Sequence, residues 1–80
     1  MRFREVALAF GRVLREERLR KGLSQEVLAL RCNFNRTYPS LLERGLRTPT
    51  LWMIFRLSAA LEVDPSFLVA AVQDELSRPQ

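Results

Sequence analysis

The order of structural elements is decided by residues 22–51, which read GLSQEVLALRCNFNRTYPSLLERGLRTPTL. Capping residues precede two apolar runs in this stretch, because Ser24 and Asn35 each supply a side-chain oxygen to a helix N-terminus. Asn33 and Gly45, which tolerate left-handed backbone, follow the two runs. The stretch therefore predicts two short helices joined by a tight turn, the first from Gln25 to about Cys32 and the second from Arg36 to Arg44.

Three further helices are expected around this pair. Apolar residues at i, i+3, i+4, i+7 and i+11 predict a helix from Phe3 to Lys21, with its inward stripe at Phe3, Val6, Ala7, Phe10 and Leu14. Thr50 caps a helix whose inward stripe is Leu51, Ile54, Leu57, Ser58 and Leu61.

Asp64 and Pro65 begin a last helix over residues 64–77, which Pro79 ends. No stretch alternates with period two, so no strand is expected. We expect an all-α fold of five helices, in one domain over residues 1–80.

Composition limits the chemistry that the chain can perform. With zero His and one Cys, the sequence excludes an internal disulfide, a Cys/His zinc cluster and histidine acid-base catalysis. We therefore expect no catalytic residue, no metal and no cofactor. The longest apolar run, residues 67–72, is too short to cross a bilayer, and no cleavable apolar leader follows Met1. These features predict a soluble, cytoplasmic protein without a membrane partner.

The positive charge is concentrated in one half of the chain. The formal net charge is +4, from 13 Lys and Arg against 9 Asp and Glu. Residues 12–47 hold nine cations and four anions, whereas residues 48–80 hold two cations and four anions. This distribution favours a polyanion as partner, with nucleic acid as the leading candidate, although charge alone is equally compatible with a solvated surface.

The predicted helix pair has the build of a helix-turn-helix. Small Ala29 lies one turn before Asn33, where the two helices must cross closely, and Leu28 and Leu42 anchor the pair to the core. The second helix is short enough to enter a DNA major groove. Its outward face is mostly polar, consisting of Arg36, Thr37, Ser40, Leu41 and Arg44.

An ordered set of residues extends this pattern over nearly the whole chain. It comprises Gly11, Arg15, Arg18, Gly22-Leu23-Ser24-Gln25-Glu26, Leu28-Ala29, Arg36-Thr37-Tyr38, Ser40, Leu42-Glu43-Arg44-Gly45, Arg47 and Pro49-Thr50-Leu51. In this set the sequence resembles the Cro/lambda-repressor type of helix-turn-helix regulators, the xenobiotic-response-element class. It is most similar to compact single-domain members such as restriction-modification controller proteins, phage and plasmid repressors, and some antitoxins.

The resemblance implies a lambda-repressor-like DNA-binding domain with a role for each matching residue. Contacts to the base edges of double-stranded DNA are implied for Arg36, Thr37, Ser40 and Leu41, with Arg36 the strongest candidate for specificity. Contacts to DNA phosphates are implied for Gln25, Asn35, Tyr38, Arg44, Arg47 and Thr50. Arg18 and Glu43 match a structural ion pair between the first helix and the end of the recognition helix.

Position 39 departs from the family pattern, because Pro39 replaces a branched apolar residue. With Asn35 as the N-cap, Pro39 would remove one amide hydrogen bond and disfavour helical geometry at Tyr38. Two outcomes are open. Either the first turn of the recognition helix is distorted, or the helix begins later and Arg36 and Thr37 lie in the approach to it.

The chain has more apolar residues near its C-terminus than one buried stripe needs. Residues 67–72 are apolar around the whole circumference of a helix, which predicts a homodimer interface at Phe67, Val69, Val72 and Leu76. Trp52, Met53 and Phe55 are also in excess, and either fill the core irregularly or meet another subunit. A twofold dimer would place two recognition helices about 34 Å apart, one turn of duplex.

These features predict a sequence-specific double-stranded DNA-binding transcriptional regulator, not an enzyme. It would act in the cytoplasm, in association with the nucleoid, as a homodimer on a pseudo-palindromic operator. The alternative is an antitoxin-like module with autoregulatory DNA binding, whose apolar C-terminal helix masks a second protein. A basic helix lying on an anionic membrane is disfavoured by the glutamates of the first helix and by the ordered motif.

Overall fold

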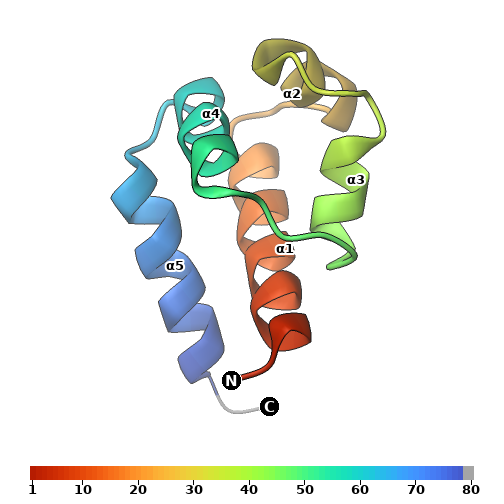
Figure 1. The fold of residues 1–80 in the computed structure, drawn as a ribbon. Helices are drawn as coiled ribbons and strands as arrows, with labels where there is room; N and C mark the ends of the chain where they lie inside the picture. The colour runs from red at the N-terminus through yellow and green to blue at the C-terminus, as the bar shows by residue number, and fades with distance from the viewer. Residues whose placement is uncertain (79–80) are drawn as a thin grey trace.

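The computed structural model describes residues 1–78 and forms five helices, with no strand among these residues. They are α1 (Phe3–Arg20), α2 (Gln25–Cys32), α3 (Tyr38–Glu43), α4 (Leu51–Leu61) and α5 (Pro65–Ser77). Helix α1 lies between α5 and α3, and α2 and α4 pack together near the C-terminal end of α1 (Figure 1). The expected all-α, five-helix fold is confirmed. Pro79, the expected end of the last helix, lies outside the described residues.

Side-chain caps begin α2 and α4 where the sequence predicts them. The Ser24 hydroxyl accepts a hydrogen bond from the Val27 amide at 3.1 Å, and the Thr50 hydroxyl accepts one from the Met53 amide at 3.2 Å. Asn33 ends α2 in the left-handed conformation, with φ of 57°. Asp64 occupies the N-cap of α5 but makes no side-chain capping bond there.

Helix α3 begins at Tyr38 and not at Arg36, which corrects the predicted start of the recognition helix. The Asn35 carboxamide oxygen accepts hydrogen bonds from the Thr37 amide at 2.9 Å and from the Thr37 hydroxyl at 2.8 Å, which stabilises a turn ahead of the helix. Pro39 then occupies the second helical position, where its missing N–H removes no helical hydrogen bond. Of the two outcomes left open by the sequence, the structure has the later start.

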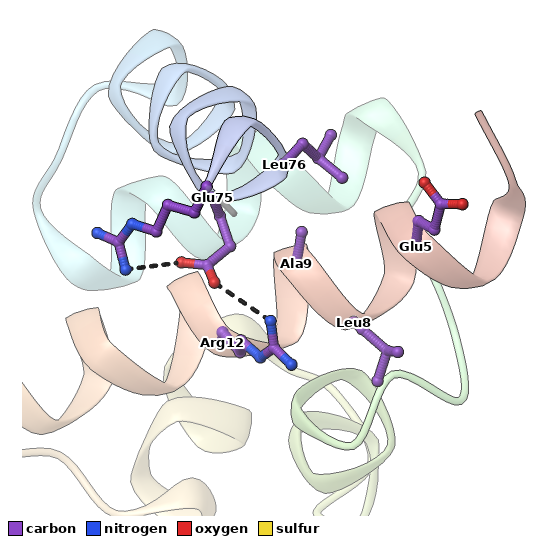
Figure 2. A pocket seen from close by; sticks show the side chains of 7 residues that line it. Glu5, Leu8, Ala9, Arg12, Glu75 and Leu76 are labelled. Carbon is purple, nitrogen blue, oxygen red and sulfur yellow. Dashed lines mark hydrogen bonds and ion pairs between the residues drawn. The ribbon is translucent and has the colours of Figure 1, made fainter. Parts of the chain in front are cut away.

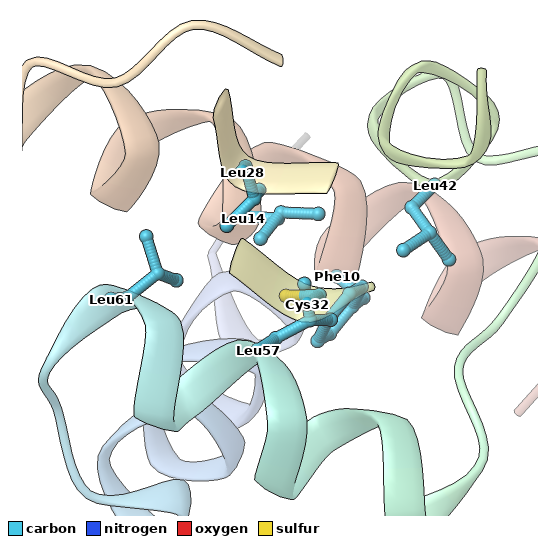
Figure 3. Packing of buried hydrophobic residues seen from close by; sticks show 7 residues of the cluster. All are labelled: Phe10, Leu14, Leu28, Cys32, Leu42, Leu57 and Leu61. Carbon is cyan, nitrogen blue, oxygen red and sulfur yellow. The ribbon is translucent and has the colours of Figure 1, made fainter. Parts of the chain in front are cut away.

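The core is built by seven residues from four helices (Figure 3): Phe10, Leu14, Leu28, Cys32, Leu42, Leu57 and Leu61. Two residues expected on buried stripes are instead exposed, Phe3 to 66% and Leu51 to 69%. Each is the first residue of its helix, where the apolar stripe extends past this core cluster.

The Arg56 side chain joins α4 to the end of α2 by a hydrogen bond. Its guanidinium donates to the Cys32 carbonyl, one of the last carbonyls of α2, and lies 4.9 Å from the centre of the Trp52 ring. Burial raises the pKa of the Cys32 thiol, and the positive charge of Arg56 opposes this shift. The thiolate is therefore disfavoured, as expected of a core cysteine.

Gly11 marks the closest approach of α1 to α3. A Cβ at this position would lie 2.6 Å from the carbonyl oxygens of both Leu42 and Glu43. Since these are backbone atoms, the two helices would have to separate to admit a methyl group.

Replacing Gly11 with alanine is therefore expected to lower the free energy of unfolding by about 2 kcal/mol, despite the higher helix propensity of alanine. Urea denaturation measures this change. Glu16→Ala, on the exposed face of α1, is the control and should change stability by less than about 0.5 kcal/mol. Equal stability of the two variants would show that α1 and α3 pack less closely than described here.

Candidate nucleic-acid interface

The candidate base-contacting residues lie in the turn before α3 and in the middle of α3. Arg36 and Thr37 belong to the turn and are exposed, whereas Ser40 and Leu41 lie in α3 and are half-buried. The Arg36 side chain is 76% exposed and donates from Nη2 to Glu26 Oε1 at 3.2 Å. The guanidinium therefore lies at the surface, next to the first turn of α2.

A buried ion pair joins α1 to α3 beneath this surface. Arg18 Nε donates to Glu43 Oε2 at 2.6 Å and Arg18 Nη2 donates to Glu43 Oε1 at 3.0 Å, with side chains only 8% and 4% exposed. Arg18 Nη1 also donates to the Leu23 carbonyl at 2.8 Å, in the loop before α2. The hydrogen bond to Glu43 raises the pKa of Arg18, so the guanidinium stays charged. The bidentate pair and the bond to Leu23 therefore connect α1, α3 and the loop before α2.

Gln25, a candidate phosphate contact, is joined to the same network. Its side-chain Nε2 donates to Glu43 Oε1 at 3.0 Å. An amide nitrogen carries two hydrogens, so one donor of Gln25 stays available while the other is bonded to Glu43. Glu43 thus fixes the orientation of a polar group at the N-terminus of α2, where the helix dipole favours an anion.

The other candidate phosphate contacts fall into two groups. Arg44 and Arg47 are exposed on the segment from the end of α3 onward. Asn35 and Thr50 are exposed, but their side-chain oxygens accept hydrogen bonds from the chain itself, in the turn and in the α4 cap. Only their exposed backbone and remaining polar atoms can face a ligand.

Tyr38 holds α3 against α4. Its hydroxyl donates to the Met53 sulfur at 2.9 Å, and its ring packs edge-on against Phe34 with 5.2 Å between ring centres. Burial raises the pKa of Tyr38, while the positive charge of Arg47 opposes this shift. The phenol is therefore a protonated donor, which must leave Met53 to reach a phosphate.

The four residues predicted to form one dimer interface line four different hollows. Phe67 lines two of them, one toward α1 beside Val13 and Glu17 and one toward α4 beside Ser58. Val69 and Val72 line an apolar hollow of about 180 Å³, which is completed by Val6, Phe10, Thr48, Pro49 and Ile54. Val72 also packs against the core.

Leu76 lines a hollow with Leu8 and Ala9 (Figure 2). There Glu75 is held between Arg12 at 3.3 Å and Arg78 at 3.4 Å. The four residues therefore do not share one hollow, and an interface at Phe67, Val69, Val72 and Leu76 stays a prediction.

Two residues of this surface escaped the sequence prediction, Leu51 and Glu26. Leu51 had been expected in the core, but it is exposed on α4 together with Trp52 and Phe55, which the sequence had identified as surplus apolar residues. Glu26, the partner of Arg36, was not identified as a site residue. Its negative charge within a basic segment was the one available signal.

The described residues offer neither a membrane span nor a metal site. None of the helices within residues 1–78 is long and apolar enough to span a membrane. The same residues contain no group of three or more His, Cys, Asp or Glu side chains placed to bind a metal ion.

Comparison with known proteins gives matches along most of the chain. The helix-turn-helix domain family matches residues 9–68. The control protein C.BamHI of Bacillus amyloliquefaciens is 45% identical over 65 residues, which cover 80% of each chain.

Solved structures are also similar. The restriction-modification controller protein C.AhdI from Aeromonas hydrophila is 44% identical, with a TM-score of 0.75 over 78% of this chain and 90% of that one. The controller protein C.Esp1396I, solved as a tetramer with its natural 35 base-pair operator, is 30% identical, with a TM-score of 0.82. That match covers 91% of this chain and 96% of the other.

Proposed function

The chain belongs to the helix-turn-helix family that includes the restriction-modification controller proteins, and on this premise we propose that it is a sequence-specific DNA-binding transcriptional regulator. It acts as a homodimer on a pseudo-palindromic operator in double-stranded DNA. The observation that carries this proposal is the operator complex of C.Esp1396I, whose fold matches 91% of this chain. The exposed cations around α3 supply the complementary charge.

The comparisons favour this function over the antitoxin-like alternative, because the relatives described above are controller proteins. We propose that the chain has no catalytic activity and needs no metal or cofactor. Its place in the cell is the cytoplasm, with the nucleoid, where its operator lies.

We propose that Arg36, Thr37, Ser40 and Leu41 contact base edges. Arg36 and Thr37 approach the groove from the turn ahead of α3, so the Asn35 bonds to Thr37 limit how far this segment can move. A guanidinium matches guanine O6 and N7 with two donors, while the methyl groups of Thr37 and Leu41 suit a thymine methyl. Ser40 adds a hydroxyl that can donate or accept.

We propose that Gln25, Asn35, Tyr38, Arg44, Arg47 and Thr50 contact phosphates. The exposed guanidinium groups of Arg44 and Arg47 carry most of the charge, and the second amide hydrogen of Gln25 adds a donor beside the α2 N-terminus. These contacts position the protein on the duplex but do not read its sequence.

Equilibrium binding at several salt concentrations tests the function. Duplex affinity should fall linearly with the logarithm of salt concentration, with a slope of about −0.9 for each phosphate neutralised. A protein that fails to bind any duplex at low salt, at concentrations on the order of 10 μM, is not a DNA-binding regulator.

We propose that the dimer forms through α4 and the adjoining face of α5, a surface we call the α4–α5 face, consisting of Leu51, Trp52, Phe55, Val69 and Val72. Leu51, Phe55 and Ser58 share one stripe of α4, and Ser58 lies beside Phe67 in a hollow between α4 and α5. The stripe therefore runs along the side of α4 that adjoins α5. Val69 and Val72 continue the apolar surface into the 180 Å³ hollow.

The exposed area fits the apolar centre of such an interface. Trp52 and Phe55 are 60% and 56% exposed. With Leu51 and Val69 they present on the order of 400 Å² of apolar surface, if a whole aromatic side chain presents about 150–250 Å². A standard interface buries about 800 Å² from each partner and consists of an apolar centre and a polar rim. The exposed apolar area is therefore enough for the centre of such an interface.

Replacing Phe55 with serine is expected to weaken the dimer at least about 30-fold, because a central aromatic residue typically contributes 2 kcal/mol or more. Sedimentation equilibrium measures the dimer dissociation constant. Leu19→Ser is the matched control, since Leu19 is similarly exposed but lies on α1. An unweakened dimer in Phe55→Ser, or equal weakening in both variants, would contradict an interface on the α4–α5 face.

A further inference from the structure

Arg36 is held at the protein surface by one acidic residue. Arg36 Nη2 donates to Glu26 Oε1 at 3.2 Å, and the two side chains are 76% and 72% exposed. Glu26 is the second residue of α2, whose start is fixed by the Ser24 cap. The backbone after Arg36 is fixed by the two Thr37 bonds to Asn35. The contact therefore joins two well-defined parts of the backbone.

Stability does not account for this pair. An exposed ion pair contributes little to folding, because water screens both charges and the side chains lose freedom on pairing. A carboxylate on a surface that meets phosphates also opposes binding by like-charge repulsion. Glu26 is thus unfavourable for general DNA affinity. Its place beside Arg36 is better explained by an effect on the Arg36 side chain itself.

The contact leaves the recognition edge of Arg36 available. A guanidinium has five N–H donors, and Glu26 accepts one of them. Two parallel donors are enough to meet guanine O6 and N7. A free arginine side chain samples many rotamers, whereas one held at Nη2 presents its remaining donors in a narrower range of directions.

We propose that Glu26 is a positioning residue for Arg36, which orients the guanidinium toward one base pair and thereby raises discrimination at that pair. The inference rests on the proposed function. It adds that specificity depends on an acidic residue that itself contacts no base. General affinity for DNA is reduced by the same residue.

The test compares Glu26→Ala, Glu26→Gln, Arg36→Ala and the double variant Glu26→Ala/Arg36→Ala. The operator is first identified by selecting bound duplexes from a random pool, and the base pair that depends on Arg36 is the one whose preference is lost in Arg36→Ala. Affinity is then measured on this operator, on the operator with that base pair changed, and on an unrelated duplex. The ratio of the first two affinities should fall about 5-fold to 10-fold in Glu26→Ala and by less in Glu26→Gln, which keeps an acceptor. Affinity for the unrelated duplex should stay equal or rise.

The double variant separates positioning from simple charge repulsion. In the Arg36→Ala background, Glu26→Ala should leave the ratio unchanged, because there is no guanidinium to orient. Glu16→Ala, an exposed acid on α1, is the control and should leave the ratio unchanged. The melting temperature should fall only slightly in the Glu26 variants, which lose a favourable first-turn charge of α2, and should stay unchanged in Glu16→Ala.

Equal effects of Glu26→Ala on all three duplexes, or an unchanged ratio, would overturn the inference and leave the DNA-binding function intact. A changed ratio in the Arg36→Ala background would overturn it as well. If the unaltered protein binds no duplex, the proposed function itself fails.

Discussion

Replacing Glu43 with alanine is expected to lower the free energy of unfolding by about 3–5 kcal/mol, because it leaves Arg18 charged, buried and without its bidentate partner. A domain of this size has a total stability of roughly 4–12 kcal/mol, so the variant should lose a large share of its stability. Chemical denaturation followed by far-UV circular dichroism measures the change. The same substitution also releases the Gln25 side chain.

Two further variants distinguish a buried charge from lost packing. Gln25→Ala removes only the amide bond to Glu43 and should cost about 1 kcal/mol. The double variant Arg18→Met/Glu43→Leu removes both charges and should be more stable than Glu43→Ala. A loss below about 1 kcal/mol in Glu43→Ala would contradict a buried, coupled pair.

Replacing Arg36 with alanine is expected to remove about 1–3 kcal/mol of discrimination at one base pair in each half-site. The reason is that no other side chain of the turn carries a bidentate donor. Binding to a set of operator variants, each changed at one base pair, measures this loss. Affinity for unrelated duplexes should change much less.

Arg47→Ala is the matched control, since Arg47 is exposed but is assigned to a phosphate. Its loss should weaken binding to every sequence alike and reduce the salt slope by about 0.9 for each phosphate contact. If Arg36→Ala and Arg47→Ala weakened all operator variants equally, Arg36 would be a second phosphate contact.

Local capping chemistry made most of the fold predictable. Ser24 and Thr50 begin their helices, and Asn33 and Gly45 adopt the left-handed conformation, as their side chains and backbone freedom require. These positions depend on residues within one helical turn, which a sequence displays directly. The residues of the ion pair were predictable for another reason, since Arg18 and Glu43 match a family motif.

The start of α3 was not decided by the sequence. Asn35 could cap a helix at Arg36 or bond to Thr37 in a turn, and both satisfy its carboxamide oxygen. The structure has the turn, which places Pro39 where its ring is tolerated. Asn35 favours both the helix N-cap and the turn, and the residue types alone do not decide which of the two conformations forms.

Surfaces made by different helices were the least predictable feature. Residues 67–72 are apolar on all sides, so helical periodicity does not define which side of α5 faces α1 and which faces α4. Phe67 lines one hollow toward α1 and another toward α4, and Val69 lines a hollow shared by Val6 of α1 and Ile54 of α4. The Glu26–Arg36 contact likewise depends on the path of the turn after α2, which brings Arg36 next to the first turn of that helix. Helical periodicity does not predict this path.

Selection of bound duplexes from a random pool tests the central claim most directly. A twofold dimer with one recognition segment per subunit should enrich an inverted repeat, with half-site centres about 10 base pairs or a multiple of that apart. Each half-site should contain a guanine whose enrichment disappears in Arg36→Ala. Enrichment of a single asymmetric site, or of no sequence at all, would contradict the account.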